Sequence, residues 1–321
     1  MSSRKRVIKN RSGNSSLENL FDEYQVKNKV RNLSASTIKG YQEGYDRFTG
    51  VVGHDLTADG VSSTTVDRFT LALMEEGLRT ASINHYLRCV RSFLYWCMDE
   101  EFIGRFKIRM LKEQESVKPT YTDEQIRLLV HEPRRDALYT EWRCWAMACW
   151  FLGTGNRAET ACSVRLGDVS FQDREIRINR TKTHQAIVLP LSDELATVLR
   201  KFISMFRDVD KPEEYLFPSV GNTKLTVNAL KISMRQYNQR RSVTMTGLHA
   251  YRHTFAKNWI RNTGDVFRLQ KILGHKTLEM TRRYVNMFAE DLKDGYESFC
   301  PLDTIKRPGG NATKNIHPPH R

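Results

Sequence analysis

The chain has 321 residues, which is enough for two domains with sizeable cores. Its 51 lysines and arginines exceed its 37 aspartates and glutamates, and the formal net charge of +14 favours a nucleic-acid partner over a merely solvated basic surface. No apolar run reaches the roughly 18 residues that a membrane helix needs, and the first residues show no apolar signal core, so we expect a cytoplasmic protein acting on nucleoid DNA.

The first third of the chain predicts a basic arm followed by a small helical domain. Residues 1–14 carry five basic and no acidic side chains, a composition that predicts a mobile arm. The spacing of Ser15 and Glu18 matches a helix capping box, and apolar residues then recur at helical intervals through residues 15–108. Residues 109–120 are polar and charged and predict a linker between domains.

Residues 121–300 predict a second, larger domain. Thr122 and Gln125 repeat the capping-box spacing, and the run CWAMACWFLGTG, apolar all round and closed by glycine, predicts a buried central helix. Alternating β-branched residues in EIRIN and AIVLP predict two strands joined by a polar turn that holds Lys182. Further helices are predicted over residues 192–207, 226–240, 247–263 (ending at Gly264), 265–273 (ending at Gly274) and 277–290. The Pro-, Gly- and Asn-rich residues 301–321 predict a disordered tail.

The stretch LHAYRHTFA contains the densest polar cluster of the chain. His249, Arg252 and His253 stand at helical positions i, i+3 and i+4, so they project from one face of the predicted helix. This cluster fits a phosphate grip, because a guanidinium pairs two oxygens at once. Three alternatives are the start of a zinc site with His275, a helix-turn-helix motif, and an ordinary polar helix face. The arginine and the missing HExxH motif argue against a metal, and no metal or other cofactor is expected.

Taken with the rest of the chain, these residues resemble the tyrosine recombinase (phage integrase) family. TGNRAETACSVRLGDVS is similar to the first arginine motif of that family, RTKTHQAIVLPL to its lysine hairpin, LHAYRHTFA to its His-x-x-Arg box, and LGHKTLEMTRRY to its last box. The catalytic residues that the resemblance implies are Arg157, Lys182, His249, Arg252, His275 and the nucleophile Tyr284. One position departs from the pattern: the family often has an acid three residues after the first arginine, where this chain has Thr160 preceded by Glu159.

The resemblance implies a mainly α fold with a small β-hairpin or sheet, in which a helical core-binding domain precedes a catalytic domain. It implies a site-specific recombinase, an integrase or transposase of a mobile element, that cuts and rejoins double-stranded DNA through a 3′-phosphotyrosyl intermediate without metal or ATP. The implied partners are DNA, three further copies of the chain in a tetramer with the C-terminal segment docking in trans, and accessory proteins. A type IB topoisomerase-like enzyme and a noncatalytic DNA-binding regulator remain the alternatives. His253 is expected either to pack the helix or to take a direct part.

Overall fold

The computed structural model describes residues 15–113, 118–178, 187–262 and 264–288, of which 286–288 are described by their backbone alone. The chain divides into two compact units, residues 1–116 and 117–321, which are described separately below. Four predicted features lie outside the described residues: the basic arm, the turn with Lys182, the segment that follows residue 288 and the C-terminal tail.

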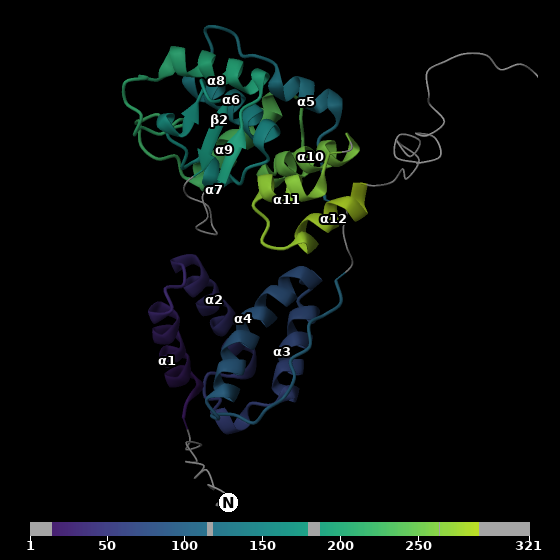
Figure 1. Ribbon diagram of the computed structural model, residues 1–321. Coiled ribbons are helices and arrows are strands. Elements are labelled where there is room, and N and C mark those ends of the chain that lie inside the picture. The colour runs from purple at the N-terminus through teal and green to yellow at the C-terminus, as the bar shows by residue number, and fades with distance from the viewer. Residues whose placement is uncertain (1–14, 114–117, 179–186, 263, 289–321) are drawn as a thin grey trace, which may run out of the picture. The chain divides into compact units, whose positions relative to one another are not determined.

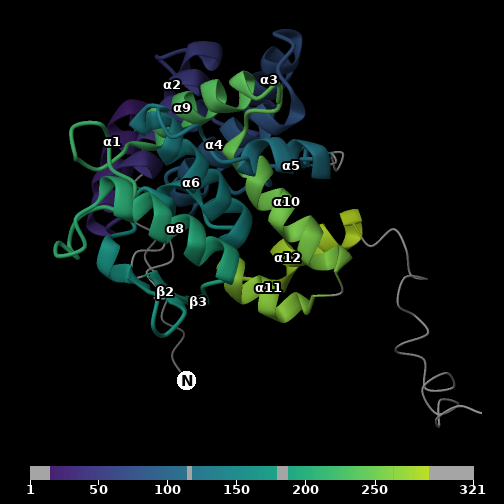
Figure 2. The same ribbon diagram turned by 90° about the horizontal axis from the view of Figure 1, so that it is seen from above.

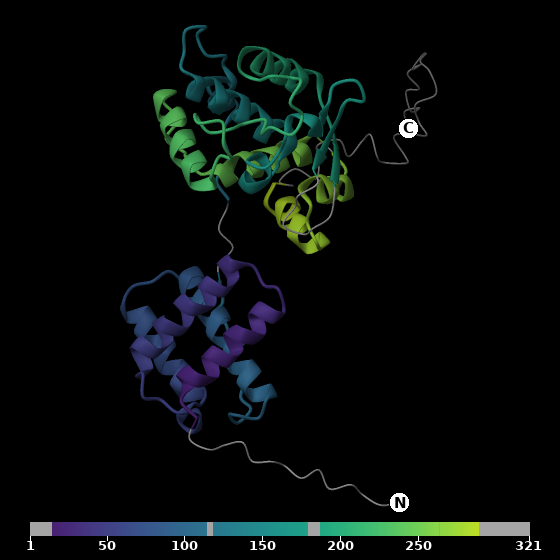
Figure 3. The same cartoon turned by 90° about the vertical axis from the view of Figure 1, so that its left-hand side faces the viewer.

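The first unit is built from α-helices, as Figures 1 and 3 show. Its elements are α1 (Leu17–Val30), α2 (Ala35–Val52), the 3-10 turn η1 (Ala58–Gly60), α3 (Ser63–Glu75) and α4 (Thr80–Asp99). α4 packs against the other three helices. The centre of the unit is aromatic: Phe21 stacks on Tyr45 with ring centroids 3.9 Å apart and meets Phe93 edge-on at 5.2 Å. Aromatic pairs of this kind add to the stabilisation that burial alone provides.

α1 begins one residue later than its sequence predicts. The N-cap is Ser16, whose hydroxyl accepts a hydrogen bond from the N–H of Asn19 at 3.3 Å. Ser15 is held in place by its backbone instead, because its carbonyl accepts the N–H of Ala58 at 3.2 Å. The capping box predicted for Ser15 and Glu18 is therefore wrong in register. Glu18 still lies in the first turn, where a carboxylate is favoured by the helix dipole.

The second unit is mainly helical with one small sheet (Figures 1 and 2). Its elements are α5 (Asp123–Val130), α6 (Tyr139–Thr154), α7 (Ala158–Ala161), the 3-10 turn η2 (Leu166–Asp168), β1 (Val169–Ser170), β2 (Glu175–Ile178), β3 (Ile187–Pro190), α8 (Asp193–Phe206), α9 (Val227–Arg240), α10 (Leu248–Arg261), α11 (Val266–Leu273) and α12 (Leu278–Phe288).

α6 forms the centre of the second unit, as its apolar sequence predicts. It packs against α5, α8, α9 and α10, and Trp142, Trp150 and Phe151 are at most 1 % exposed. The capping box of α5 is also observed: the Thr122 hydroxyl accepts the Gln125 N–H, and the Gln125 side chain accepts the Thr122 N–H. Because α6 is closely packed on all sides, it gives a rigid frame for the residues that follow it in the chain.

The sheet is antiparallel, with strand order β1–β2–β3. Ile176 of β2 lies opposite Leu189 of β3, and both side chains are buried, whereas Val188, next to Leu189 on β3, is 58 % exposed. This alternation is what the EIRIN and AIVLP patterns predict. β3 also contacts α11, so the sheet adjoins the C-terminal helices of the unit.

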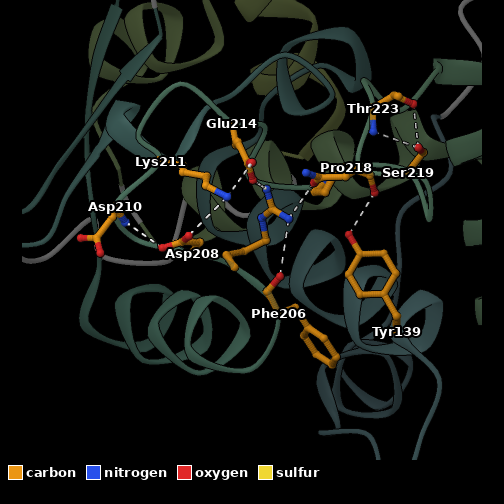
Figure 4. Close-up of polar contacts among 11 residues, drawn as sticks. Tyr139, Phe206, Asp208, Asp210, Lys211, Glu214, Pro218, Ser219 and Thr223 are labelled. Carbon is orange, nitrogen blue, oxygen red and sulfur yellow. Dashed lines mark hydrogen bonds and ion pairs between the residues drawn. The ribbon is translucent and has the colours of Figure 1, made fainter.

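The segment between α8 and α9 is tied to the helical core by polar contacts (Figure 4). The Arg207 side chain, only 6 % exposed, pairs with Glu214 at an N···O distance of 2.5 Å. From α6, the hydroxyl of Tyr139 donates to the carbonyl of Pro218 at 3.0 Å. The ion pair thus links two points of this segment, from the end of α8 to Glu214, and the hydrogen bond from Tyr139 joins the segment to α6.

The observed architecture confirms the predicted fold class, a mainly α protein with a small β-sheet. One predicted helix end is wrong: α10 ends with Asn262 as its C-cap and not at Gly264. Gly274 does close α11, in the left-handed conformation. Among the described residues, no helix combines the length and apolarity needed to cross a membrane.

Candidate active site

Five of the six predicted site residues come from four parts of the second unit that meet beside α10. Arg157 directly precedes α7, His249 and Arg252 lie on α10, His275 follows α11, and Tyr284 lies on α12. α10, α11 and α12 contact one another, and Figure 2 shows them side by side. The sixth predicted residue, Lys182, lies outside the described residues.

A left-handed glycine at the end of α6 positions Arg157. Gly155 has φ +62° and ψ 14°, which glycine adopts at little cost. A β-carbon at this position would also lie 2.6 Å from Phe255 and 2.8 Å from Leu273. The chain therefore turns sharply after α6 and passes close to α10 and α11. Arg157, two residues later, starts α7 from this turn.

Arg252 is buried and joins the elements around it through backbone carbonyls. Its side chain donates from Nη1 to the Gly155 carbonyl at 2.8 Å and from Nη2 to the Leu273 carbonyl at 2.7 Å. The residue is 5 % exposed. Burial and the nearby charge of Arg157 lower the pKa of Arg252 to about 10, which still leaves the guanidinium charged at neutral pH.

Arg157 approaches one of these two carbonyls, that of Leu273. Its Nη1 donates to Leu273 at 3.4 Å, so two guanidinium groups share one acceptor. Each guanidinium carries five N–H donors, and two like charges held this close favour an anion between or beside them. The pair is suited to the nonbridging oxygens of a phosphodiester.

His275 is oriented by two hydrogen bonds. Its Nε2 lies 2.9 Å from Nη2 of Arg252, and its Nδ1 lies 2.8 Å from the Thr281 hydroxyl. Because arginine can only donate, Nε2 accepts and Nδ1 carries the proton. Burial, followed by the charges of Arg252 and Arg157, lowers the pKa of His275 to about 4, so the ring is neutral at physiological pH.

Tyr284 is nearly buried. It is 7 % exposed and packs in a small apolar cluster with Ala256, Leu269 and Leu273. Its ring lies parallel to that of His275, with centroids 6.1 Å apart. Burial raises the pKa of the phenol, and the charges of Arg252 and Arg157 oppose that effect. The hydroxyl is thus held protonated beside two fixed cations.

The structure brings His253 to the Tyr284 hydroxyl, a contact that the sequence did not reveal. His253 Nδ1 lies 2.9 Å from the Tyr284 oxygen, whereas His249, one turn earlier on α10, is exposed. The two histidine rings meet edge-on, with centroids 6.1 Å apart. The sequence signal was the i, i+4 spacing from His249, which places both rings on one face but does not show which of them faces α12.

Glu159 points to a different neighbour. Its carboxylate pairs with Lys224 at 2.8 Å, and both side chains are substantially exposed. In the part of the chain that the structure describes, no hydrogen bond joins Glu159 to Arg157 or Arg252. Because Thr160 stands where the family often has an acid, and Glu159 pairs with Lys224, neither residue brings a carboxylate to the arginine pair.

Among the described residues, no group of three or more His, Cys, Asp or Glu could hold a metal ion.

Comparison with known proteins identifies the family of this chain. The family model described as "Phage integrase family" matches residues 120–291. The tyrosine recombinase XerD of Oceanobacillus iheyensis is 25 % identical over 84 % of this chain and 94 % of its own length. The integrase of Escherichia phage P2 is 26 % identical over 84 % of this chain and 72 % of its own. A crystal structure of a lambda integrase tetramer bound to a Holliday junction aligns with a TM-score of 0.67 at 16 % identity, covering 86 % of this chain and 83 % of that one.

Proposed function

Because the chain belongs to the phage integrase family, a family of site-specific DNA strand-transferring enzymes, we propose that it recombines double-stranded DNA through a 3′-phosphotyrosyl intermediate on Tyr284. One observation carries this proposal: the Tyr284 hydroxyl lies in the same small site as two guanidinium groups and two oriented histidines. The site offers a nucleophile next to positive charge, which is what attack on a phosphodiester requires.

The arrangement assigns each residue a step. Arg157 and Arg252 bind the nonbridging phosphate oxygens and stabilise the charge that develops in the transition state. The tyrosine oxygen forms a bond to phosphorus while the bond to the 5′ oxygen breaks, and the leaving oxygen takes a proton. As the family resemblance implies, we assign the donation of that proton to Lys182 and give His249 an acid/base or positioning role toward the tyrosine and the phosphate. His275 would donate to the phosphate only as its imidazolium or its other tautomer, because its Nε2 accepts from Arg252 in this structure.

Neither a metal nor ATP is part of the proposed reaction. The phosphotyrosyl bond retains the energy of the phosphodiester, and attack by a free 5′ hydroxyl on that bond rejoins a strand. Two fixed guanidinium groups supply the positive charge that a metal provides in other phosphoryl-transfer sites. Activity that disappears on treatment with a chelator would contradict this part of the proposal.

We further propose that the enzyme serves a mobile element, as an integrase or transposase. The similarity to the phage P2 integrase supports this role, whereas the comparable similarity to a XerD recombinase fits a chromosomal role equally well. The DNA next to the gene separates the two. A gene at the edge of a prophage or transposon, beside inverted repeats, supports the mobile-element role, and a gene with no such boundary contradicts it.

The active form is proposed to be a tetramer on DNA, in which residues 288–300 of each copy dock on a neighbour. The second unit has a groove of about 870 Å³ beside α10 and α11 that offers room for apolar side chains of this segment, such as Leu292, Tyr296 and Phe299. It is lined by Leu152, Phe255, Trp259 and residues around Asp265. Removal of residues 289–321 is expected to leave DNA binding by single copies intact and to abolish assembly of the four-copy complex, which gel mobility on a DNA substrate would measure.

Accessory proteins are further proposed partners. Whether the purified enzyme alone completes recombination tests this proposal.

The central test is trapping of the covalent intermediate. A DNA substrate nicked near the cleavage point loses its short 5′ fragment after cleavage, so the enzyme remains attached to DNA. The wild-type chain is expected to form this adduct, and Tyr284→Phe is expected to bind the same DNA without forming it. An adduct that persists in Tyr284→Phe refutes the assignment of the nucleophile. Lys182→Ala is expected to slow cleavage of an ordinary substrate far more than that of one with a 5′-thio leaving group, since sulfur leaves without a proton.

A further inference from the structure

The contact between α10 and α12 distinguishes the two histidines of LHAYRHTFA. His253 Nδ1 lies 2.9 Å from the Tyr284 oxygen, within hydrogen-bond range. Their ring centroids are 5.6 Å apart, and the two ring planes are tilted by 48°. His249 is exposed on the preceding turn, and its described contact is with the His253 ring and not with the phenol.

The other neighbour of Tyr284 leaves its hydroxyl hydrogen free for this hydrogen bond. Arg252 hydrogen-bonds to the phenol and lowers its pKa, against the larger opposing effect of burial. Because a guanidinium can only donate, the tyrosine oxygen accepts from Arg252. The single hydroxyl hydrogen remains available to His253, whose Nδ1 accepts it in the tautomer that carries its proton on Nε2. A lone pair of the tyrosine oxygen remains for attack on phosphorus.

The groups around His253 keep its ring uncharged before DNA binds. Burial is the main cause, followed by His249 on the same helix, Lys118 in the segment before α5, and Arg252, and together they lower the pKa of His253 to about 4. An uncharged imidazole has a free acceptor nitrogen, which an imidazolium lacks. A bound phosphate would offset the charge of Arg252, and the negative charge that develops during attack would favour a proton on His253.

We propose that His253 is the catalytic residue that accepts the proton of the Tyr284 hydroxyl as the tyrosine attacks DNA. This inference rests on the proposed function. During cleavage the oxygen–hydrogen bond of Tyr284 breaks, its electron pair forms the bond to phosphorus, and the proton moves to Nδ1 of His253. The bond from phosphorus to the 5′ oxygen breaks with its electron pair, and the proposed acid protonates that oxygen. During joining, the imidazolium of His253 returns the proton to the departing tyrosine oxygen.

The test measures the rate of adduct formation in single turnovers on a nicked substrate with a 5′-thio leaving group, between pH 4 and pH 8. The thio group removes the need for an acid, so the rate reports on the nucleophile alone. His253→Asn keeps an acceptor oxygen near the position of Nδ1 but takes no proton, and it is expected to react roughly 10²-fold more slowly or worse. DNA binding and the melting temperature of the variant, measured in parallel, are expected to match those of the wild type.

The pH profile separates proton transfer from simple positioning. The wild-type rate is expected to fall about tenfold per pH unit below a pKa that lies between about 4, the value without DNA, and the ordinary value of about 6.5. His253→Asn is expected to lose this dependence. His249→Asn, the matched change one turn earlier, is expected to keep it, whatever its effect on the rate.

The failures are distinguishable. If the wild type forms no adduct, the proposed function fails and the role of His253 falls with it. If the wild type forms the adduct but His253→Asn reacts within threefold of its rate, or if the pH dependence disappears in His249→Asn instead, the inference alone is wrong. Should His253→Asn lose DNA binding, His253→Gln takes its place, with the same expected rate and pH profile.

Discussion

Replacing Arg252 by lysine would test whether this side chain holds the unit together as well as binding phosphate. The side chain makes two hydrogen bonds to backbone carbonyls, at Gly155 and Leu273, and a third contact with His275. A lysine keeps the charge but has one nitrogen, which can reach one of these carbonyls. If the lysine bonds to the Leu273 carbonyl, which Arg157 also contacts, the Gly155 carbonyl is left buried without a donor. That costs roughly 1–3 kcal/mol, and the lost charge-assisted hydrogen bond contributes about as much. We therefore expect Arg252→Lys to lower the free energy of unfolding of the second unit by about 2–4 kcal/mol.

Urea unfolding followed by tryptophan fluorescence measures this loss. Four of the five tryptophans, Trp142, Trp145, Trp150 and Trp259, lie in the second unit, so the signal reports mainly on it. Arg261→Lys is the matched control, because Arg261 is exposed in the last turn of the same helix, and it is expected to change stability by less than about 0.5 kcal/mol. If Arg252→Lys is as stable as the control while DNA cleavage is lost, Arg252 serves only the phosphate, and the structural part of the reasoning is refuted.

Three further predictions concern residues around the same site. Gly155→Ala is expected to destabilise the second unit by roughly 1–3 kcal/mol, through its positive φ and the clash with Phe255, whereas Gly247→Ala, with negative φ and open space around it, is the control in the same urea assay. Glu159→Gln is expected to leave the rate of adduct formation within about twofold of the wild type, because the carboxylate pairs away from the site; a loss of tenfold or more would show that it acts in catalysis. Because the pKa of His275 is lower in the folded chain than in the unfolded chain, the unfolded chain binds a proton at this residue more readily. The contribution of His275 to the free energy of unfolding is therefore fully present above about pH 6.5 and is lost as the pH falls towards 4. His275→Asn should make the fall in unfolding free energy over that range smaller, and an unchanged fall would contradict the neutral, buried ring.

The sequence predicted the elements of the second unit better than the contacts between them. The buried helix α6, the hairpin strands and the glycine ends of α6 and α11 are local patterns, in which hydrophobic periodicity and backbone conformation act within a few residues. The predicted start of α1 was wrong because the backbone of Ser15 is hydrogen-bonded to Ala58, more than forty residues away, and no local pattern contains that contact.

The same distinction applies to the site. The motifs single out Arg157, Arg252 and Tyr284, which the structure brings together, but their hydrogen-bond partners could not be predicted. Arg252 binds carbonyl oxygens, and a carbonyl oxygen exists at every position whatever its side chain, so the sequence contains no mark of Gly155 or Leu273 as acceptors. The choice between His249 and His253 depended on how α12 packs against α10, which is a tertiary contact between segments about thirty residues apart.

The attachment of Arg252 to main-chain carbonyls also has a genetic consequence. A mutation that damages an ion pair can be suppressed by a change in the partner side chain, but the acceptors of Arg252 are backbone oxygens that no codon change removes or recreates. In a selection for restored recombination by an Arg252 variant, we therefore expect true revertants and not compensating changes at positions 155 or 273. Conversely, a substitution at position 273 keeps the backbone oxygen that Arg252 binds, so we expect it to act through the lost packing of the buried Leu273 side chain in the cluster with Tyr284.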